Sequence, residues 1–314
     1  MTTPKAKVAG LALIAVLCAG FTLGLTAPGW AGWDEAVAAL QRGDYATALR
    51  EWRPLAKQGN AKAQYNFGLM YGKGLGVPQD YAEAVKWYRK AAEQGVAEAQ
   101  FLLGAMYKDG QGAPQDYAKA VKWFRQASEQ DYANAQSDLG LMYYKGKGVP
   151  QDYAKALQWF RKAAEQDYAN AQYNLGAMYY KGHGVPQDYA KALQWLRKAA
   201  EQDDALAQSN LGVMYLEGHG VPQDYARAAK WYRKAAEQGH ALVQYVLGLM
   251  YDIGHGVPQD YVQAHMWINL AASRFPPGED QDKAVEDRDD VAKKMTSAQI
   301  SEAQKLAREW RPKK

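Results

Sequence analysis

The sequence predicts an all-α fold, a right-handed α-solenoid of stacked antiparallel helix hairpins. The first observation behind this prediction is a hexapeptide, GVPQDY or once GAPQDY, that recurs at an interval of 36 residues. The second is that apolar and small residues between the copies follow a helical period of about 3.6 residues, not the alternation of strands. The third is the Gly-X-Gly and proline that separate these segments, since both residue types end helices. The copies begin at Gly76, Gly112, Gly148, Gly184, Gly220 and Gly256.

Each unit contains two predicted helices, which the fourth copy illustrates. Residues 169–180 form the first, because Gln172 and Tyr179 belong to an i, i+3, i+4, i+7 stripe that is typical of an amphipathic helix. The second begins at Tyr189 and places Trp195 on an apolar face, away from its lysines and arginine. Units of this kind bury their apolar faces only by stacking on their neighbours.

The turn between the two helices explains the residues that first resemble an active-site loop. Gly182 follows the first helix, where a left-handed residue closes the C-terminus without steric cost. Gly184 keeps the connection free to reverse, and Pro186 cannot continue the helix. Asp188 is placed to cap the second helix, which is worth about 1 kcal/mol. A motif that occurs six times is therefore predicted to be structural.

Histidine occupies the middle of Gly-X-Gly in only three copies, which raises the alternatives of a metal ligand and a structural residue. The position is His183 and its two equivalents, but a leucine, a glutamine or a lysine in the other copies. Packed helices lie about 8–10 Å apart, whereas zinc ligands lie about 2 Å from the metal. We therefore expect exposed loop residues here and no metal site.

Aromatic residues recur in fixed registers and are predicted to form the core. Tryptophan occupies one position of the second helix, and glycine recurs along the first helix, where it would make room for the large rings. Replacing Trp159 by Ala should then cost about 3–5 kcal/mol. The tryptophans are Trp87, Trp123, Trp159, Trp195, Trp231 and Trp267.

The 36-residue unit, A-x-A-Q-x-x-L-G-x-M-Y-x-x-G-x-G-V-P-Q-D-Y-x-x-A-x-x-W-x-x-K-A-A, resembles the Sel-one-like repeat family, a relative of the tetratricopeptide pair. Six copies occupy residues 61–276. Residues 32–60 resemble a degenerate first repeat, with a shortened helix at 33–41. Two helices within residues 277–314 are expected to cover the other end of the stack, the last beginning with a capping box at Thr296 and Gln299.

Composition excludes several functions. The formal charge is +4 over 314 residues without a run of like charges, which argues against nucleic-acid binding. The single cysteine, Cys18, lies in the N-terminal apolar stretch, so the remaining chain has no cysteine nucleophile and no thiolate metal site. The sequence also lacks Ser-x-x-Lys, HExxH, GxSxG and a Walker loop. We expect no catalytic residues and no small-molecule cofactor.

Residues 1–31 have the pattern of a secretory signal peptide: two lysines, an apolar stretch and small residues near Ala31. The alternative is an uncleaved anchor, because 18 apolar or small residues nearly span a bilayer. Lipidation at Cys18 is not expected, since a bulky leucine precedes it. A periplasmic or secreted location follows, with membrane contact only through this segment if it is retained.

Positions that differ between copies are the expected partner-binding residues. They form a stripe on the first helices, and the resemblance to tetratricopeptide-like folds implies that this stripe lines a concave groove. A peptide or protein partner would contact the aromatic members as rigid anchors. The predicted contacts are Lys62, Tyr65, Leu69, Phe101, Asn134, Tyr144, Asn170, Tyr173, Tyr180 and Tyr245.

Three functions remain open from the sequence. The leading hypothesis is a non-enzymatic interaction scaffold or adaptor of the bacterial envelope. Some secreted members of the resembled family bind or hydrolyse β-lactams, but they have cysteine-bridged repeats that are missing here. A structural component of envelope or polysaccharide-export machinery is the third possibility.

Overall fold

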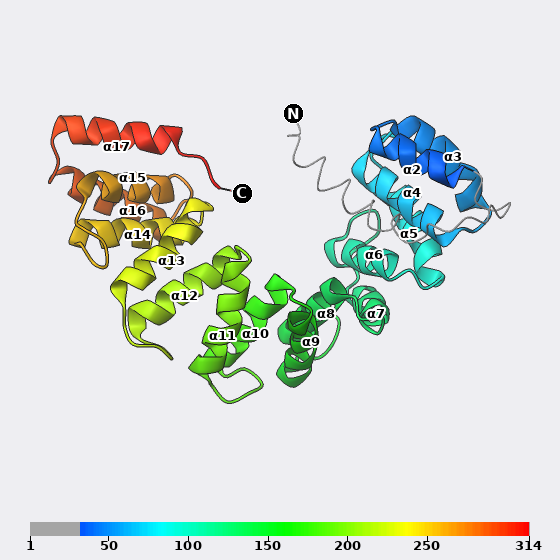
Figure 1. Cartoon of the computed structure of the whole chain (residues 1–314), viewed down its shortest axis with the longest axis horizontal. Helices are drawn as coiled ribbons and strands as arrows, with labels where there is room; N and C mark the ends of the chain where they lie inside the picture. Colours follow the sequence, from blue (N-terminus) through cyan, green and yellow to red (C-terminus); the bar gives the residue numbers. More distant parts are fainter. Residues whose placement is uncertain (1–31, 314) are drawn as a thin grey trace. The chain divides into compact units, whose positions relative to one another are not determined.

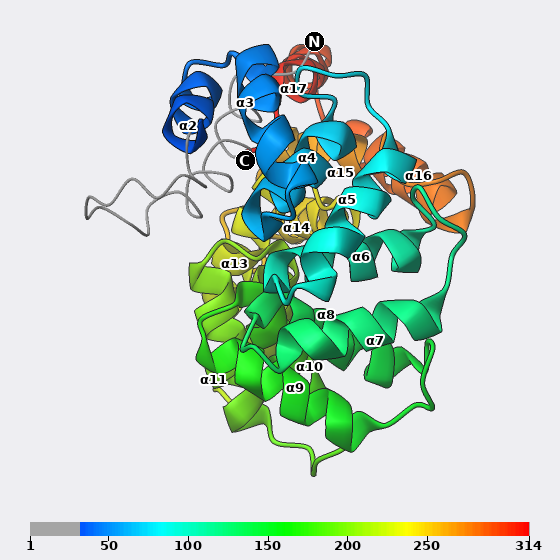
Figure 2. The same ribbon diagram turned by 90° about the vertical axis from the view of Figure 1, so that its right-hand side faces the viewer.

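The computed structural model describes residues 32–313, which contain sixteen helices and no strand (Figures 1 and 2). The predicted signal peptide lies outside this range. Within residues 32–313, every helix is too short or too polar to span a bilayer. The helices are α2 (Trp33–Gln41), α3 (Tyr45–Lys57), α4 (Ala61–Lys73), α5 (Tyr81–Glu93), α6 (Ala97–Asp109), α7 (Tyr117–Ser128), α8 (Ala133–Lys145), α9 (Tyr153–Glu165), α10 (Ala169–Lys181), α11 (Tyr189–Glu201), α12 (Ala205–Glu217), α13 (Tyr225–Glu237), α14 (Ala241–Ile253), α15 (Tyr261–Ala272), α16 (Glu279–Ala292) and α17 (Ser297–Glu309).

The described residues divide into two compact units, with the boundary between Ala156 and Leu157. In the first unit, α4 packs on α5 and α6 on α7, and each second helix also contacts the first helix of the next repeat. The second unit repeats this pattern from α10 to α15. The all-α prediction and the helix-hairpin repeat are therefore confirmed.

The turn chemistry follows the prediction closely. Gly182 has φ +71°, and its N–H donates to the Met178 carbonyl, which ends α10 in the left-handed conformation. The carboxylate of Asp188 accepts the backbone N–H of Lys191 at 2.9 Å. This hydrogen bond and the nearby ammonium hold the pKa of the Asp188 carboxyl below its usual range. Turn and cap together fix where the two helices end and begin.

The second glycine of each loop has a role that the sequence does not reveal. A Cβ on Gly112 would lie 2.2 Å from the Tyr81 carbonyl oxygen, and one on Gly256 would lie 2.0 Å from that of Tyr225. These loops therefore rest directly on the start of the second helix of the preceding repeat. Glycine is needed here for close approach as well as for its positive φ.

The core differs from the prediction in which aromatic residue it buries. The tryptophans of the first five repeats are only half-buried, whereas that of the sixth, Trp267, is buried. The residue that follows each tryptophan is buried and packs on the first-helix glycine: a Cβ on Gly104, for example, would lie 2.7 Å from the Phe124 ring. These buried residues are Tyr88, Phe124, Phe160, Leu196, Tyr232 and Ile268.

The half-buried tryptophans instead carry lysines across their outer faces. The ammonium of Lys90 lies 4.4 Å from the Trp87 ring centroid, and Lys198 lies 4.7 Å from that of Trp195. An exposed cation–π contact is worth about 0.5–1 kcal/mol. The expected cost of 3–5 kcal/mol for Trp159→Ala was wrong in assuming full burial, because Trp159 keeps part of its surface in water.

A buried row of glutamines joins successive repeats. Each Nε2 donates to the carbonyl eight residues earlier, at the end of the preceding repeat, as Gln208 does to Ala200 at 3.2 Å. A second glutamine extends the row, because Gln238 donates to Oε1 of Gln208 at 3.0 Å. Buried polar groups that are paired in this way fix one arrangement of neighbouring repeats. The buried glutamines are Gln64, Gln100, Gln136, Gln172, Gln208 and Gln244.

An arginine–tyrosine hydrogen bond adds a second link between repeats. Arg89 on α5 donates to the Tyr107 hydroxyl on α6 at 2.6 Å, and Arg197 on α11 donates to Tyr215 on α12 at 3.2 Å. These tyrosines are buried, which explains why tyrosine occupies this register. The equivalent pairs are Arg125–Tyr143, Arg161–Tyr179 and Arg233–Tyr251.

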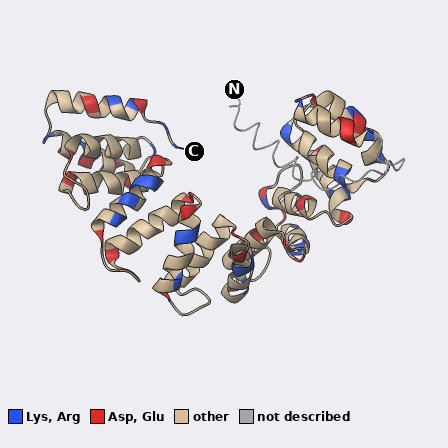
Figure 3. Cartoon of the chain, in the orientation of Figure 1, with Lys and Arg blue, Asp and Glu red and all other residues tan. Residues whose placement is uncertain are grey.

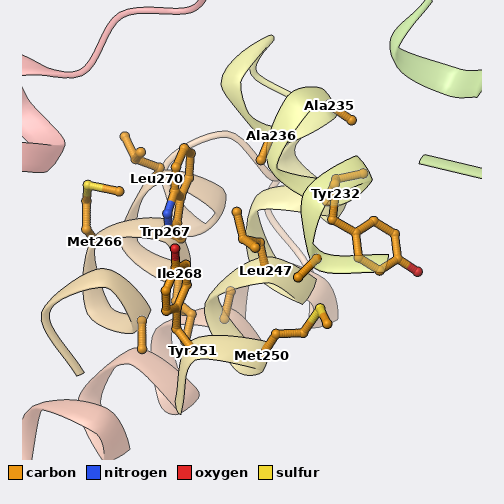
Figure 4. Close-up of a cluster of buried hydrophobic side chains, with 14 of the residues drawn as sticks. Tyr232, Ala235, Ala236, Leu247, Met250, Tyr251, Met266, Trp267, Ile268 and Leu270 are labelled. Atoms are coloured by element: carbon orange, nitrogen blue, oxygen red, sulfur yellow. The ribbon is translucent and has the colours of Figure 1, made fainter. Parts of the chain in front are cut away.

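The two end segments cover the outermost repeats of their own units. In the first unit, α2 packs on α3, where the Trp33 and Trp52 rings lie 5.6 Å apart. In the second unit, α16 and α17 both pack on α15, beside the apolar cluster that includes Ile268 (Figure 4). The Trp310 ring lies 6.4 Å from that of Trp267. Both ends therefore bury apolar faces that a repeat without a neighbour would expose.

Replacing Phe124 by Ala should lower the free energy of unfolding by about 3–5 kcal/mol, because the ring is fully buried against Gly104. Replacing the neighbouring, half-buried Trp123 by Ala is the matched control and should cost about 1 kcal/mol. Urea denaturation followed by circular dichroism measures both. A larger loss for Trp123→Ala than for Phe124→Ala would contradict this description of the core.

Candidate functional site

The predicted partner-binding residues lie on one face of the first helices α4 to α14, which we call the variable face. It comprises the positions of these helices that differ between repeats. Lys62 on α4 and Asn170 on α10 are exposed, and Asn134 on α8 is half-buried. The two units are described separately.

In the first unit, the structure corrects two predicted contact residues. Tyr65 and Leu69 are only 1% and 2% exposed, so neither presents a surface to a partner. The Tyr65 ring packs near that of Tyr88, with centroids 6.1 Å apart. Burial also raises the pKa of the Tyr65 phenol well above its usual range. Both residues belong to the core.

Phe101 and Tyr144 are half-buried and pack within the stack. The Phe101 ring lies 5.8 Å from Phe124 and 5.5 Å from Tyr132, the residue directly before α8. The Tyr144 ring lies 5.1 Å from Tyr153, the first residue of α9. Each ring keeps one part exposed while contributing to packing between helices.

An ion pair on the variable face of the first unit was not anticipated. Lys108 on α6 and Asp138 on α8 lie 3.3 Å apart, with side chains that are 27% and 23% exposed. Burial raises the pKa of the Asp138 carboxyl, although Lys108 opposes the shift. The sequence signal was available: position 138 is aspartate where α4, α10 and α12 carry asparagine.

In the second unit, Tyr245 contacts the C-terminal segment that contains α16. Its hydroxyl donates to the Asp287 carboxylate on α16, and its ring lies 6.2 Å from Phe275. The neighbouring Asp252 is paired with Lys294 at 2.8 Å. The prediction that Tyr245 contacts a partner is therefore corrected, since its hydroxyl and ring are engaged by the chain's own C-terminal segment.

The structure brings two predicted residues together in a pocket between α10 and α12. Tyr173 and Tyr180 are half-buried and line the same cavity, whose volume is about 140 Å³. Asn210 and Val213 face them from α12. The complete lining is Tyr173, Ala177, Tyr180, Lys181, Asn210 and Val213.

A polar and aromatic cluster lies beside this pocket. The Tyr180 hydroxyl and Nδ1 of His219 are 2.9 Å apart, and Glu217 lies 3.1 Å from the same nitrogen. His219 also stacks on the Tyr189 ring at 4.5 Å with an interplanar angle of 1°. Burial, followed by the Glu217 charge, raises the pKa of the Tyr180 phenol. Tyr180 is thereby held in place on one side of the pocket.

The loop histidines pack on the preceding repeat. The His255 ring lies 4.8 Å from the Tyr225 ring, in the same arrangement as His219 on Tyr189. In another repeat the ammonium of Lys147 lies 4.9 Å from the centroid of the Tyr117 ring. The residue within Gly-X-Gly thus covers the first tyrosine of a second helix. Among residues 32–313, no three potential ligands from His, Cys, Asp and Glu gather into a metal site.

The family comparison is decisive for identity. The Sel1 repeat family model matches the chain six times, over residues 61–96, 97–132, 133–168, 169–204, 205–240 and 241–274. The chain therefore belongs to the Sel1 repeat family, as the resemblance in its sequence implies. A repeat scaffold of this family is consistent with protein–protein interaction.

One solved structure supports this assignment, and a second shows similarity only. A Sel1 repeat protein from Oxalobacter formigenes is 34% identical, with a TM-score of 0.72, and the match covers 79% of this chain and 98% of the other. A protective antigen of uropathogenic Escherichia coli strains with an SLR fold is 27% identical, with a TM-score of 0.43, and the match covers 96% of this chain and 94% of the other. No curated protein matches the chain.

Replacing Asp138 by Asn should leave the protein equally or more stable at neutral pH. The folded-state pKa lies above the unfolded value near 3.8, so the folded state binds the proton more tightly and stability falls as pH rises through the raised pKa. Urea denaturation at a series of pH values from below about 4 up to neutral measures this effect. The free energy of unfolding of the Asn variant should not show the fall with pH that Asp138 causes.

Lys108→Met should have the opposite effect on stability, because it leaves the Asp138 carboxylate without its ion-pair partner. At neutral pH it should cost about 1–3 kcal/mol of unfolding free energy. A strongly destabilised Asp138→Asn variant, or a neutral Lys108→Met variant, would contradict the assigned balance between burial and pairing.

Proposed function

We propose that this Sel1 repeat protein is a non-enzymatic scaffold of the bacterial envelope, periplasmic or secreted, which binds a peptide segment of a partner protein. The pocket between α10 and α12 is the observation that carries this proposal. It is built from variable positions, whereas the neighbouring Leu175, Gly176 and Tyr179 on α10 recur in nearly every repeat. Surface residues that differ between repeats, on a core whose residues recur, are suited to the recognition of a specific partner.

The chemistry of the lining supports a peptide ligand. Tyr173 and Tyr180 offer rigid aromatic surface at low conformational cost, and Asn210 offers both a donor and an acceptor for a peptide backbone. The proposed site is narrower than the sequence predicted, because Tyr65 and Leu69 are buried and Tyr245 is engaged by α16.

Two further features support the location and the absence of catalysis. The proposed envelope location rests on the signal-like residues 1–31. The carboxylates that recur in every repeat, such as Asp116 and Asp224, accept backbone N–H groups at the starts of α7 and α13. Such carboxylates are committed to capping rather than to acid–base chemistry. The β-lactam and structural-component alternatives gain no support from the described residues.

Replacing Tyr173 and Tyr180 together by Ala should reduce partner recovery at least tenfold, which corresponds to the loss of about 1.4 kcal/mol. The measurement is in vivo photo-cross-linking from position 210, followed by mass spectrometry. Trp195→Ala is the control, since this half-buried ring lies on α11 and does not line the pocket. Unchanged cross-linking in the double variant, with its fold intact, would exclude this face.

A further inference from the structure

The pocket between α10 and α12 has apolar lining residues and one charged residue. Ala177, Val213 and the rings of Tyr173 and Tyr180 are half-buried and supply the apolar part of the lining, which is about as large as the polar part. Its volume of about 140 Å³ is close to the roughly 150 Å³ of a protein cavity that holds one benzene molecule. The space therefore suits one apolar side chain of a partner.

Lys181 gives the pocket its charge. It is the one charged residue of the lining, it is exposed at the end of α10, and it forms no salt bridge within residues 32–313. Glu217 does not line the pocket and is engaged beyond Tyr180 by His219. With Asn210 as a further hydrogen-bond donor, the edge favours an anionic group on the ligand.

The arrangement distinguishes between two sources of a carboxylate. The side chain of Asp or Glu carries its carboxylate at the tip, which would enter the apolar part of the pocket first. A C-terminal residue carries its carboxylate on the main chain, so that an apolar side chain points inward while the charge stays at the exposed edge. Since Lys181 lies at that edge, the geometry favours the C-terminal residue.

The variable face of the second unit also carries two exposed leucines. Leu206 on α12 and Leu242 on α14 are 45% and 62% exposed. They occupy equivalent positions of successive repeats, where the first four repeats carry Lys, Glu, Asn and Asn. The stack does not require leucine there, because four repeats have a polar residue at the same position. This pair is placed to contact an apolar residue upstream of the partner's last one.

We propose that the second unit recognises the free C-terminus of its partner, a segment that ends in an apolar residue with its carboxylate at Lys181. A second apolar residue a few positions earlier lies on Leu206 and Leu242. The inference rests on the proposed function and specifies its ligand: an extended C-terminal peptide rather than an internal loop.

The test uses defined peptides with the full chain. Short randomised peptides that end in Leu, Val or Phe are immobilised by their N-termini, and the tightest binders are measured by fluorescence anisotropy as free acids and as amides. The free acid should bind about tenfold more tightly, as expected for a charge-assisted contact. Lys181→Met should abolish this difference, whereas Lys198→Met on α11 should preserve it.

The outcomes separate this inference from the proposed function. Equal affinity of acid and amide, with binding still lost in the Tyr173→Ala, Tyr180→Ala double variant, would overturn C-terminal recognition and leave peptide binding intact. Preference for amidated peptides with an internal Asp or Glu would assign the pocket to an acidic side chain and also overturn it. Absence of binding by any peptide would contradict the inference, and unchanged cross-linking would then contradict the proposed function as well.

Discussion

The whole repeat depends on how closely the two helices of a hairpin approach each other. At Gly104, Gly176 and Gly212 the added Cβ of any other residue would lie within 2.7 Å of a ring or leucine on the second helix. Such contact distances leave no room for a side chain, so the buried residue after each tryptophan packs directly on the backbone of the first helix. The glutamine row and the arginine–tyrosine bonds then set one hairpin on the next.

The difference between positions that recur in every repeat and positions that vary indicates where a partner could bind. Positions that face the second helix, the loop or the next repeat are held nearly constant, because each makes a contact that recurs every 36 residues. Positions on the variable face differ between repeats, and the two units use them differently. In the first unit they include the buried Tyr65 and Leu69 and the Lys108–Asp138 pair. The second unit has a pocket with one cation and two exposed leucines. Partner recognition is therefore proposed for the second unit.

Periodicity was enough to predict the helices, their caps and the family, since helix starts and stops depend on local residues such as Asp188 and Gly182. Periodicity was insufficient to predict which of the large apolar residues are buried. Trp195 and Leu196 are adjacent in sequence and both apolar, and only the packing angle of two helices decides which is buried. Burial of Tyr65 and the capture of Tyr245 by Asp287 depend likewise on contacts between distant segments. A single-repeat pattern carries no information about such neighbours.

Gly212→Ala tests the close approach most directly, because two physical effects predict opposite signs. Helix propensity alone predicts that alanine stabilises α12 by about 0.5–1 kcal/mol. A Cβ at this position would lie 2.4 Å from the Tyr232 ring, and such overpacking costs about 1–3 kcal/mol. Urea denaturation should therefore show a less stable variant. An equally or more stable Gly212→Ala protein would contradict the packing on which the account is built.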